Sequence, residues 1–557
     1  MKHILFITSL LFSTPMLAQK GSASAKAKAT AGTPVPVVVK DPVFRKDTLS
    51  ITRVGAKADG QTLNTSAINM AILAQSKKGG GVVLVPAGFW LTGPITLQSN
   101  VNLHLAKGAL LQFTTDFDQY PLVEGNWEGL PQMRNQSPLN AKGAINIAIT
   151  GFGVIDGAGD AWRMVKKDKL TESQWRRLVA SGGVLSDDKK TWYPSAKSKL
   201  GSTMKNPGVI ESTKTPEFYA SVKDFLRPNM LVFASCKNVL LQGVTFQNSP
   251  AWCLHPLMVE NLVVRSVNVK NPWYAQNGDG IDVESCKNVL IENSIFDVGD
   301  DGICIKSGRD EAGRKRGMPT ENVLCRNNTV YHAHGGFVIG SEMSGGARNI
   351  WVENNTFIGT DIGLRFKTTR GRGGIVENIF VKNTVMKDIV GEAILFDMYY
   401  AAVDPVPLAG EERKPPVVET KPVTEETPQF RNMRITGVVC DGAEKAIFVR
   451  GLPEMAIKNI VLEDMVLAAK KGLDMTEGDG ITIRNVRFVT SERNPVLNIH
   501  NSQNITLNKI QYEKAELLLN VTGEKSERIT VRDTDKTGAT KGLELSYGAR
   551  QGAVTWN

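Results

Sequence analysis

Six side chains that could transfer a proton or bind an anion fall between residues 277 and 367. They are Asp279, Asp300, Asp301, His334, Arg365 and Lys367. Crowded carboxyl groups cannot all ionise freely, so at least one of the three should have a raised pKa. Hydrolysis of a glycosidic bond needs a carboxyl group that donates a proton and a carboxylate that activates water. The set therefore favours hydrolysis of an acidic carbohydrate, provided that these residues meet in the folded chain.

The spacing of these residues indicates that they do meet. Asp279 and Asp300 are 21 positions apart, Asp300 and His334 are 34 apart, and His334 and Arg365 are 31 apart. In a fold of coils stacked about 4.8 Å apart, residues separated by one period become neighbours. Arg365 and Lys367 are two positions apart, so both should project from the same face of a strand.

Asp300 and Asp301 are adjacent, and in an ideal strand they would point to opposite faces. Gly299 and Gly302 flank them and should allow a bulge or bend at which both carboxylates face outward. We therefore expect both to join the same outward patch.

A recurring phrase sets the period: an Asn, then alternating apolar residues, then polar residues and Gly. It begins at Asn146, Asn238, Asn261, Asn288, Asn322, Asn349, Asn378, Asn432, Asn459 and Asn504. Irregular periods of this size with short β-type runs and no helix between them are typical of a solenoid of parallel strands. A propeller would need about 40 residues per repeat, and a doubly wound fold would place helices between the strands. The sequence predicts an all-β fold, a right-handed parallel β-helix.

An amphipathic segment precedes the repeats and should cap the open end of the solenoid. Residues 65–78 place Ile68, Ala71, Ile72 and Gln75 on one side, which predicts an N-terminal capping helix. Asn64 could cap this helix through its side chain, and the glycines at 79–81 should end it. The β-helix domain is expected over residues 48–557.

The first 47 residues differ in composition from the rest. A short basic start and an apolar run at Ile4–Phe12 predict a signal peptide over 1–18, and this run is too short to span a membrane. Residues 19–47 are rich in Ala, Lys and Pro and are expected to form a flexible linker. A periplasmic or secreted protein without a membrane span follows.

Composition limits the partners. The formal net charge is +10, which favours a polyanion. No nucleic-acid-binding motif accompanies it, so an acidic polysaccharide suits better than nucleic acid. No zinc, nucleotide or flavin signature is present, so no cofactor or metal is expected, and we expect a monomer.

Cys236 and Cys286 occupy equivalent positions of the repeat, which predicts buried, unpaired thiols.

The motifs as a group resemble family 28 of the glycoside hydrolases, the polygalacturonases. In that family they read Asn-Thr-Asp, Gly-Asp-Asp, Gly-His-Gly and Arg-Ile-Lys. This chain has Asn277-Gly278-Asp279, Gly299-Asp300-Asp301, His334-Gly335-Gly336 and Arg365-Phe366-Lys367 in the same order. Gly278, Ala333 and Phe366 depart from the family pattern, but none of these changes removes a titrating group. The resemblance extends from Gly55 almost to the end of the chain.

The resemblance implies roles for individual residues. Asp300 would be the general acid of an inverting reaction, Asp279 and Asp301 would hold and activate water, and His334 would tune the acid. The implied substrate-binding residues are Asn277, Arg365, Lys367 and Tyr399, the last as the aromatic residue that the family uses near its site. The implied substrate is a pectic polysaccharide or oligogalacturonide of the plant cell wall.

Three alternatives remain open at this stage. A pectate lyase on the same solenoid would need Ca²⁺ held by clustered carboxylates. A rhamnogalacturonan-directed galacturonohydrolase would use the same chemistry on another pectic region, and a non-catalytic solenoid would bind the polymer without cleaving it. Two inserted segments, Thr171–Pro228 and Arg309–Pro319, favour walls that close one end of the cleft and hence an exo-acting bacterial type.

Overall fold

A computed structural model gives the structure of the chain and describes residues 35–36, 38–400 and 419–557. Residues Pro36–Asn557 form one compact unit. The expected signal peptide at 1–18 and the part of the expected linker before residue 35 lie outside the described residues. None of the described helices is long and apolar enough to cross a membrane.

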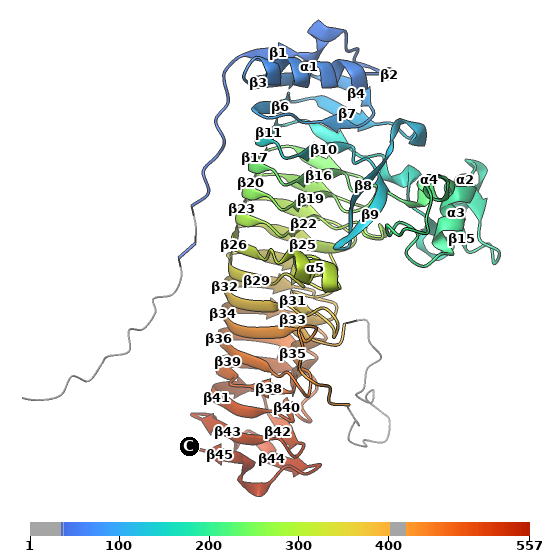
Figure 1. Cartoon of the computed structure of the whole chain (residues 1–557). Helices are drawn as coiled ribbons and strands as arrows, with labels where there is room; N and C mark the ends of the chain where they lie inside the picture. The colour runs from blue at the N-terminus through green and yellow to red at the C-terminus, as the bar shows by residue number, and fades with distance from the viewer. Residues whose placement is uncertain (1–34, 37, 401–418) are drawn as a thin grey trace, which may run out of the picture. The chain divides into compact units, whose positions relative to one another are not determined.

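One sheet of 14 described strands runs along the solenoid, with one strand from each coil and parallel neighbours throughout (Figure 1). We call it the site sheet. Its strands are β5 (Ile95–Thr96), β10 (Leu139–Lys142), β16 (Leu231–Ala234), β19 (Leu254–Leu257), β22 (Ile281–Glu284), β25 (Asp301–Lys306), β28 (Gly335–Ile339), β31 (Leu364–Lys367), β33 (Glu392–Asp397), β35 (Lys445–Arg450), β37 (Lys471–Thr476), β40 (Leu497–His500), β42 (Ala515–Thr522) and β44 (Ala539–Ser546).

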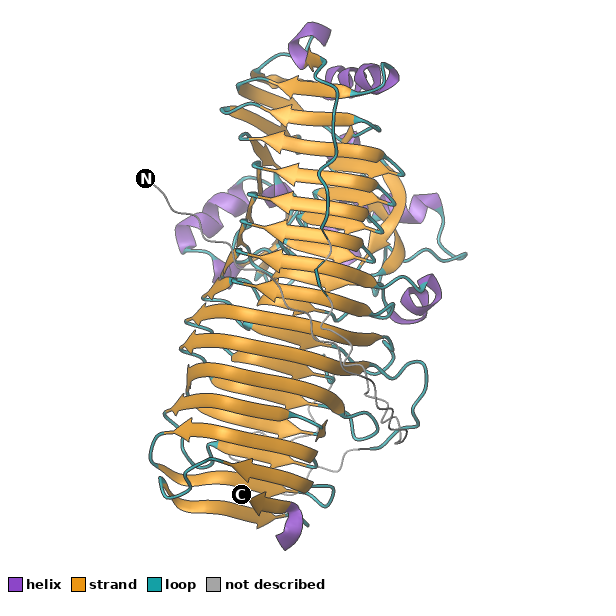
Figure 2. Ribbon diagram, turned by 90° about the vertical axis from the view of Figure 1, so that its left-hand side faces the viewer, coloured by secondary structure: helices purple, strands orange, loops and turns teal. Residues whose placement is uncertain are grey.

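A second sheet, with 26 described strands, supplies one or two strands to each coil (Figure 2). Its strands are β1 (Thr48–Ser50), β2 (Asp59–Leu63), β3 (Gly81–Val85), β4 (Gly88–Thr92), β6 (Val101–Leu105), β7 (Ala109–Phe113), β11 (Ile145–Gly151), β12 (Val154–Asp156), β17 (Lys237–Gln242), β18 (Thr245–Gln247), β20 (Glu260–Arg265), β21 (Asn268–Lys270), β23 (Lys287–Glu292), β24 (Ile295–Asp297), β26 (Thr320–Arg326), β27 (Thr329–Tyr331), β29 (Ala347–Glu353), β30 (Thr356–Ile358), β32 (Ile375–Lys387), β34 (Gln429–Asp441), β36 (Ile457–Ala469), β38 (Gly478–Asp479), β39 (Thr482–Thr490), β41 (Gln503–Tyr512), β43 (Glu527–Arg532) and β45 (Val554–Trp556). The prediction of a right-handed parallel β-helix is confirmed.

The recurring Asn residues form a ladder along the stack. Asn238, Asn261 and Asn288 have φ between 57° and 62°, a left-handed conformation that Asn tolerates better than most residues. Each donates its side-chain amide to the Asn of the preceding coil, as from Asn261 to Asn238 at 2.9 Å and from Asn288 to Asn261 at 2.9 Å. The ladder continues through Asn322, Asn349 and Asn378. It keeps consecutive coils in register, and so fixes which residues of the site sheet are neighbours.

Helix α1 (Thr65–Lys77) caps the first coil, as the sequence predicts, and buries Ile68, Ala71, Ile72 and Gln75. Asn64 stands at its N-terminal boundary, but its side chain makes no capping hydrogen bond. Its amide bonds the backbone of Lys57 and Leu91 instead. The expected side-chain cap is therefore wrong, because two neighbouring segments compete for the same amide.

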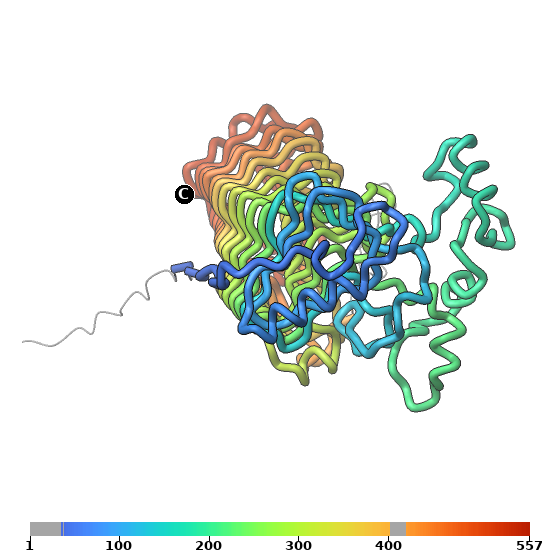
Figure 3. The backbone as a smooth tube through the Cα atoms, turned by 90° about the horizontal axis from the view of Figure 1, so that it is seen from above, coloured from blue at the N-terminus to red at the C-terminus, as the bar shows by residue number. Residues whose placement is uncertain are grey.

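Three inserted elements leave the coils between the early part and the middle of the stack (Figures 1 and 3). The first is the hairpin of β8 (Leu122–Trp127) and β9 (Leu130–Asn135). The second, within the expected insertion Thr171–Pro228, contains α2 (Glu172–Ala180), α3 (Ala196–Ser202) and α4 (Pro216–Ser221), with the small strands β14 (Val184–Leu185) and β15 (Thr191–Tyr193). β15 also pairs with β13 (Val165–Lys166), just before the insertion. The third is α5 (Asp310–Arg316), within Arg309–Pro319.

The structure also shows the state of the cysteines and of residues 38–47. All six cysteines are buried and free, as predicted. The last part of the expected linker packs on the solenoid: Val39 is buried against Leu240 and Val263, and Asp41 pairs with Arg265 at 2.8 Å.

Candidate active site

Four adjacent strands of the site sheet, β22, β25, β28 and β31, position the candidate residues. β22 pairs with β25 so that Ile281 lies opposite Ile303, which brings Asp279 and Asp301 to equivalent places just before this pairing. The backbone N–H of Gly280 donates to the carbonyl of Asp301 at 2.9 Å. Parallel register therefore turns a separation of more than twenty residues into direct contact.

The three carboxylates converge. One oxygen from each of Asp279, Asp300 and Asp301 lies within 4.8 Å of the others. Asp300 stands in the bend before β25, and its Oδ1 accepts a hydrogen bond from the backbone N–H of Asp301 at 2.9 Å. A Cβ atom on Gly299 would approach the carbonyl of Pro272 to 2.5 Å. Gly299 therefore serves close packing behind the bend, whereas the sequence suggested conformational freedom.

Arg365 and Lys367 reach the same cluster from β31. Lys367 Nζ donates to Asp301 Oδ2 at 2.7 Å, and Arg365 Nη1 contacts Asp301 Oδ1 at 3.3 Å. Burial acts to raise the pKa of Asp301, but Lys367 and Arg365 outweigh it and hold that pKa below its ordinary value. Asp301 is therefore a carboxylate at any moderately acidic pH.

Asp279 has the opposite environment. Its exposed fraction is 3%, and its Oδ1 has no hydrogen-bond partner in the described part of the chain. Burial raises the pKa of Asp279 well above its ordinary value, and the carboxylates of Asp282, Asp300 and Asp301 raise it further. Two neighbouring carboxyl groups thus have pKa values displaced in opposite directions, which is typical of acid–base sites.

His334 lies at the open side of the cluster. Its Nδ1 is 3.3 Å from Asp300 Oδ1, and its Nε2 is 3.6 Å from Asp361 Oδ2. The contact with Asp300 raises the pKa of His334 despite partial burial. The structure therefore brings His334 to Asp300, and Asp361 is a neighbour that the motif pattern does not indicate.

Asn277 joins the site through its backbone and its side chain. Its N–H donates to Asp300 Oδ2 at 3.2 Å, and its Oδ1 accepts a hydrogen bond from Arg227 Nη2 at 3.1 Å. Arg227 comes from the end of the long insertion, and no repeat or motif in the sequence points to it.

Tyr399, the aromatic residue that the sequence suggests for the site, has its ring beside two arginines outside the cluster. The ring of Tyr399 lies 5.5 Å from the Arg370 guanidinium and 5.2 Å from that of Arg450. The ring of Tyr400 instead lies 5.0 Å from Lys367 Nζ and 5.8 Å from the Arg365 guanidinium. β33 ends at Asp397, so strand alternation cannot tell from the sequence which of the two tyrosines turns toward the site.

A second group of charged side chains lies beside the cluster. Asp282 is fully buried, and neither of its carboxylate oxygens has a hydrogen-bond partner among the described residues. Its nearest cation is Lys306, whose Nζ lies 3.6 Å from Asp282 Oδ1 and 2.8 Å from Glu342 Oε2. Burial raises the pKa of Asp282 well above its ordinary value. Neither Asp282 nor Lys306 is among the site residues that the sequence predicts.

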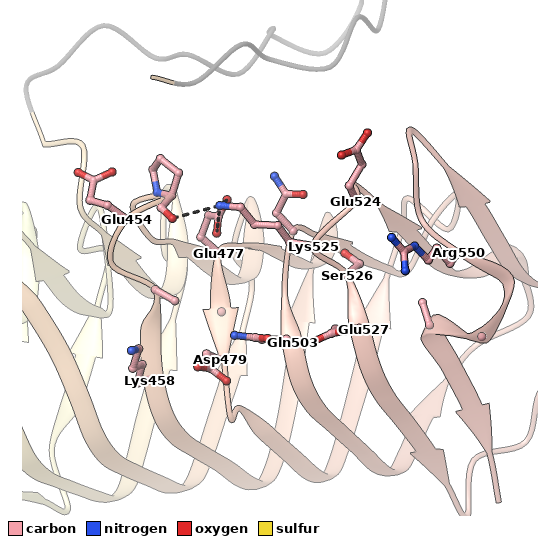
Figure 4. A pocket seen from close by; sticks show the side chains of 16 residues that line it. Glu454, Lys458, Glu477, Asp479, Gln503, Glu524, Lys525, Ser526, Glu527 and Arg550 are labelled. Atoms are coloured by element: carbon pink, nitrogen blue, oxygen red, sulfur yellow. Dashed lines mark hydrogen bonds and ion pairs between the residues drawn. The ribbon is translucent and has the colours of Figure 1, made fainter. Parts of the chain in front are cut away.

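A cavity of about 740 Å³ lies away from this cluster, on the coils of β36 to β45 (Figure 4). Lys525 points across it to Glu477 at 3.2 Å. Its charged residues of both signs face one another, and none of the six candidate residues lines it. The candidate residues lie instead on and beside β22 to β31.

The chain matches the model of glycosyl hydrolases family 28 over residues 220–424. It is 30% identical over 353 residues, 62% of this chain, to a "probable polygalacturonase" of Vitis vinifera. It is 33% identical over 363 residues, 63% of this chain, to an exo-poly-alpha-D-galacturonosidase of Dickeya chrysanthemi. It spans 61% and 57% of the lengths of these two relatives.

Among solved structures, a hyperthermoactive exopolygalacturonase from Thermotoga maritima superposes with a TM-score of 0.65 at 33% identity. The match covers 81% of this chain and 93% of that one, so nearly the whole relative is shared. Fold, motif order and sequence agree, and the chain belongs to family 28 of the glycosyl hydrolases.

Proposed function

We propose that this protein hydrolyses α-1,4 linkages between galacturonic acid residues of pectin, acting from the chain end with inversion. The observation that carries the proposal is the cluster of Asp279, Asp300 and Asp301 within 4.8 Å, with two cations beside it. A carboxylate cluster alone could cleave many sugars. Arg365 and Lys367 add the positive charge that a uronic acid requires.

In the proposed reaction Asp300 protonates the leaving oxygen, because it is the member of the cluster in contact with His334. Asp279 and Asp301 hold the attacking water between them. Asp301 stays ionised beside Lys367, whereas Asp279 accepts the proton of the water more readily because its pKa is raised by burial. Water attack and proton donation then occur on opposite sides of the sugar.

Arg365 and Lys367 bind the sugar carboxylate, and Tyr400 lies over both cations where a sugar ring would pass. Both cations also neutralise Asp301 in the free protein, so a bound carboxylate would share them with Asp301. Arg365 offers a planar fork that can bind a carboxylate through two hydrogen bonds, and Lys367 adds a point charge.

The direct test is release of reducing ends from polygalacturonate by the purified protein, with Asp300→Asn as the inactive control. Products should be saturated uronic acids. Unsaturated, ultraviolet-absorbing ends that disappear with a chelator would instead indicate a calcium-dependent lyase, since three clustered carboxylates are also possible cation ligands.

Exo action is supported by the β8–β9 hairpin. It leaves an early coil, yet its Gly129 carbonyl accepts a hydrogen bond from the N–H of Arg309, just after β25, at 3.3 Å. Glu128 pairs with Arg309 at 3.3 Å, and Trp127 stacks on Trp252 with ring centroids 5.8 Å apart. The hairpin thus crosses the coils from its own as far as that of β25, and we infer that it forms a wall at the N-terminal end of the cleft.

The two segments expected as walls support this hairpin. Met133 N–H donates to the Gly208 carbonyl at 2.8 Å, so the long insertion packs behind the hairpin. Helix α5 begins at the contact with the hairpin tip. The Dickeya and Thermotoga relatives, both described as exo-acting, support the same proposal.

Time-resolved product analysis tests the direction of attack. An exo enzyme releases mono- or disaccharide from the first minutes while the viscosity of long polygalacturonate barely falls. Shortening the hairpin by replacing residues 124–133 with a two-residue turn should allow mid-chain cleavage. Mixed oligomers and rapid viscosity loss with the unaltered protein would contradict exo action.

We further propose that the protein is exported to the periplasm or beyond. The apolar start of the sequence supports this. Fractionation of producing cells, with detection of the mature N-terminus near residue 19, tests it.

A further inference from the structure

Two arginine side chains lie beside the candidate site with no ion-pair partner within 4 Å among the described residues. Arg134, on β9, is 7% exposed, and its Nε has no hydrogen-bond partner in the described part of the chain. Arg227 is partly buried next to it, and its carbonyl accepts a hydrogen bond from Arg134 Nη2. A buried cation without a counter-ion costs several kcal/mol, so the buried Arg134 beside a second, partly buried arginine requires an explanation.

Their charges repel each other. Burial lowers the pKa of Arg134, and Arg227 lowers it further. Burial, followed by Arg163, lowers the pKa of Arg227 to about 10. Glu128 attracts both through space and Asp300 attracts Arg227, but Glu128 forms its ion pair with Arg309 at 3.3 Å and Asp300 contacts His334 at 3.3 Å. The pair is therefore electrostatically suited to receive an anion.

Both guanidinium groups are held in place. Arg227 Nη1 donates to the carbonyls of Pro250 and Gln276, at 2.8 and 3.1 Å. Arg134 stacks on Trp127, with its guanidinium 3.6 Å from the ring centroid. A charged fork that is fixed before binding loses little conformational entropy when a ligand arrives.

The pair lies next to the candidate acid and on the walled side. Arg227 Nη2 donates to Asn277 Oδ1 at 3.1 Å, and Asn277 N–H donates to Asp300 Oδ2 at 3.2 Å. Arg134 belongs to the hairpin, whereas Arg365 and Lys367 reach Asp301 from coils on the C-terminal side. The two pairs of cations therefore lie on opposite sides of the carboxylates along the stack.

We propose that Arg227, supported by Arg134, binds the carboxylate of the terminal sugar on the hairpin side of the scissile bond. This proposal rests on the proposed function and adds to it a second site of carboxylate recognition. The enzyme would then require a uronic acid both before and after the bond that it cleaves. A terminal neutral sugar would leave the two arginines unpaired and would be rejected.

The test uses two trisaccharides, trigalacturonate and a matched one with galactose as the released terminal residue. A hydrogen bond to a charged group contributes about 1.5–3 kcal/mol, so Arg227→Gln should lower kcat/KM on trigalacturonate about 10- to 150-fold. It should change kcat/KM on the neutral-ended substrate less than about 3-fold. Equal losses on both would overturn the proposal, because they would mean that Arg227 acts only by holding Asn277.

Two further variants keep the test decisive. Arg227→Lys keeps the charge without the fork and should recover part of the preference for the acid. Arg348→Gln is the matched control, since Arg348 lies on β29 of the second sheet and pairs with Glu321. It should leave both rates unchanged.

Binding of free galacturonate, measured by calorimetry, separates this proposal from the proposed function. In a Lys367→Met background, which weakens the other proposed carboxylate site, the protein should bind galacturonate, and adding Arg227→Gln should weaken this binding at least 10-fold, whether or not either protein cleaves polygalacturonate. Equal affinities in both proteins would overturn the proposal even if polygalacturonate is cleaved.

Discussion

The site sheet has two halves that share one backbone and differ in what they carry. In β22 to β31 its outward positions hold Asp282, Arg365 and Lys367, beside the carboxylate cluster. In β37 to β42 the equivalent positions hold a polar ladder in which Asn498 donates to Asp474 at 3.1 Å and Asn520 donates to Asn498 at 2.9 Å. The ladder satisfies its own hydrogen bonds, whereas the cluster leaves Asp279 Oδ1 and both Asp282 oxygens without partners.

The difference between the two halves shows that strand register alone does not create the shifted pKa values. Register brings residues from consecutive coils together in both halves. The hairpin and α5 flank the first half, and burial is the first cause of the raised pKa values of Asp279 and Asp282 there. The repeat therefore brings the charged residues together. We attribute to the insertions the burial that shifts the pKa values of these residues.

The largest expected effect is that of Asp300→Asn, which removes the proposed proton donor from the first half. Turnover on polygalacturonate should fall about 10²–10⁴-fold, the usual contribution of general acid catalysis. The matched change in the second half, Asp474→Asn, should cost less than about 2-fold. Initial rates of reducing-end release measure both. Near-normal turnover by a folded Asp300→Asn protein would contradict the role of Asp300 as proton donor.

Lys367→Met should have the next largest effect. Lys367 holds the pKa of Asp301 down, so removing it should raise that pKa and move the acidic limb of the pH–rate profile to higher pH. The loss on free-acid substrate should be on the order of 10²-fold, because the sugar carboxylate loses its pairing with Lys367. The loss on the methyl ester should be much smaller. Equal losses on acid and ester with an unmoved acidic limb would show a structural role only.

Asp279→Asn should stabilise the protein against heat. The pKa of Asp279 is higher in the folded state than in the unfolded one, so the folded state binds more protons between those two values. The stability contribution of Asp279 is thus present at low pH and is lost as pH rises through that window. The gain in Tm from Asp279→Asn, measured by calorimetry, should therefore grow from pH 4 to pH 7. A gain that shrinks with rising pH would contradict the burial argument.

Asn288→Ala tests the Asn ladder that keeps the coils in register. It removes two ladder hydrogen bonds, to Asn261 at 2.9 Å and from Asn322 at 3.1 Å, and places Ala at φ of 58°. The expected cost is about 1–3 kcal/mol of unfolding free energy, with turnover per folded molecule nearly unchanged. Urea titration measures it, and a neutral effect would mean that strand pairing alone maintains the register.

The sequence predicts the parts of the molecule that follow its repeat. The Asn phrases indicate the coils, and the intervals between Asp279, Asp300, His334 and Arg365 indicate their meeting. Arg134 and Arg227 could not be found in this way, because they belong to insertions whose docking depends on tertiary contacts. The sequence also cannot tell whether Tyr399 or Tyr400 lies near Arg365 and Lys367, since this depends on how the chain turns after the last residue of β33.

One geometric feature makes the stereochemistry of the reaction the sharpest test. The nearest oxygens of the three carboxylates lie within 4.8 Å, whereas acid and base of inverting enzymes are typically about 6.5–9.5 Å apart. Two carboxylates holding one water between them would allow inversion at the shorter separation. A nucleophilic carboxylate at the same distance would instead give retention.

Proton NMR of the first turnovers on polygalacturonate distinguishes these outcomes before the product mutarotates. Attack by a water held between Asp279 and Asp301, with Asp300 as proton donor, predicts that the β-anomer of the new reducing end appears first. The α-anomer appearing first would contradict the roles proposed for all three carboxylates.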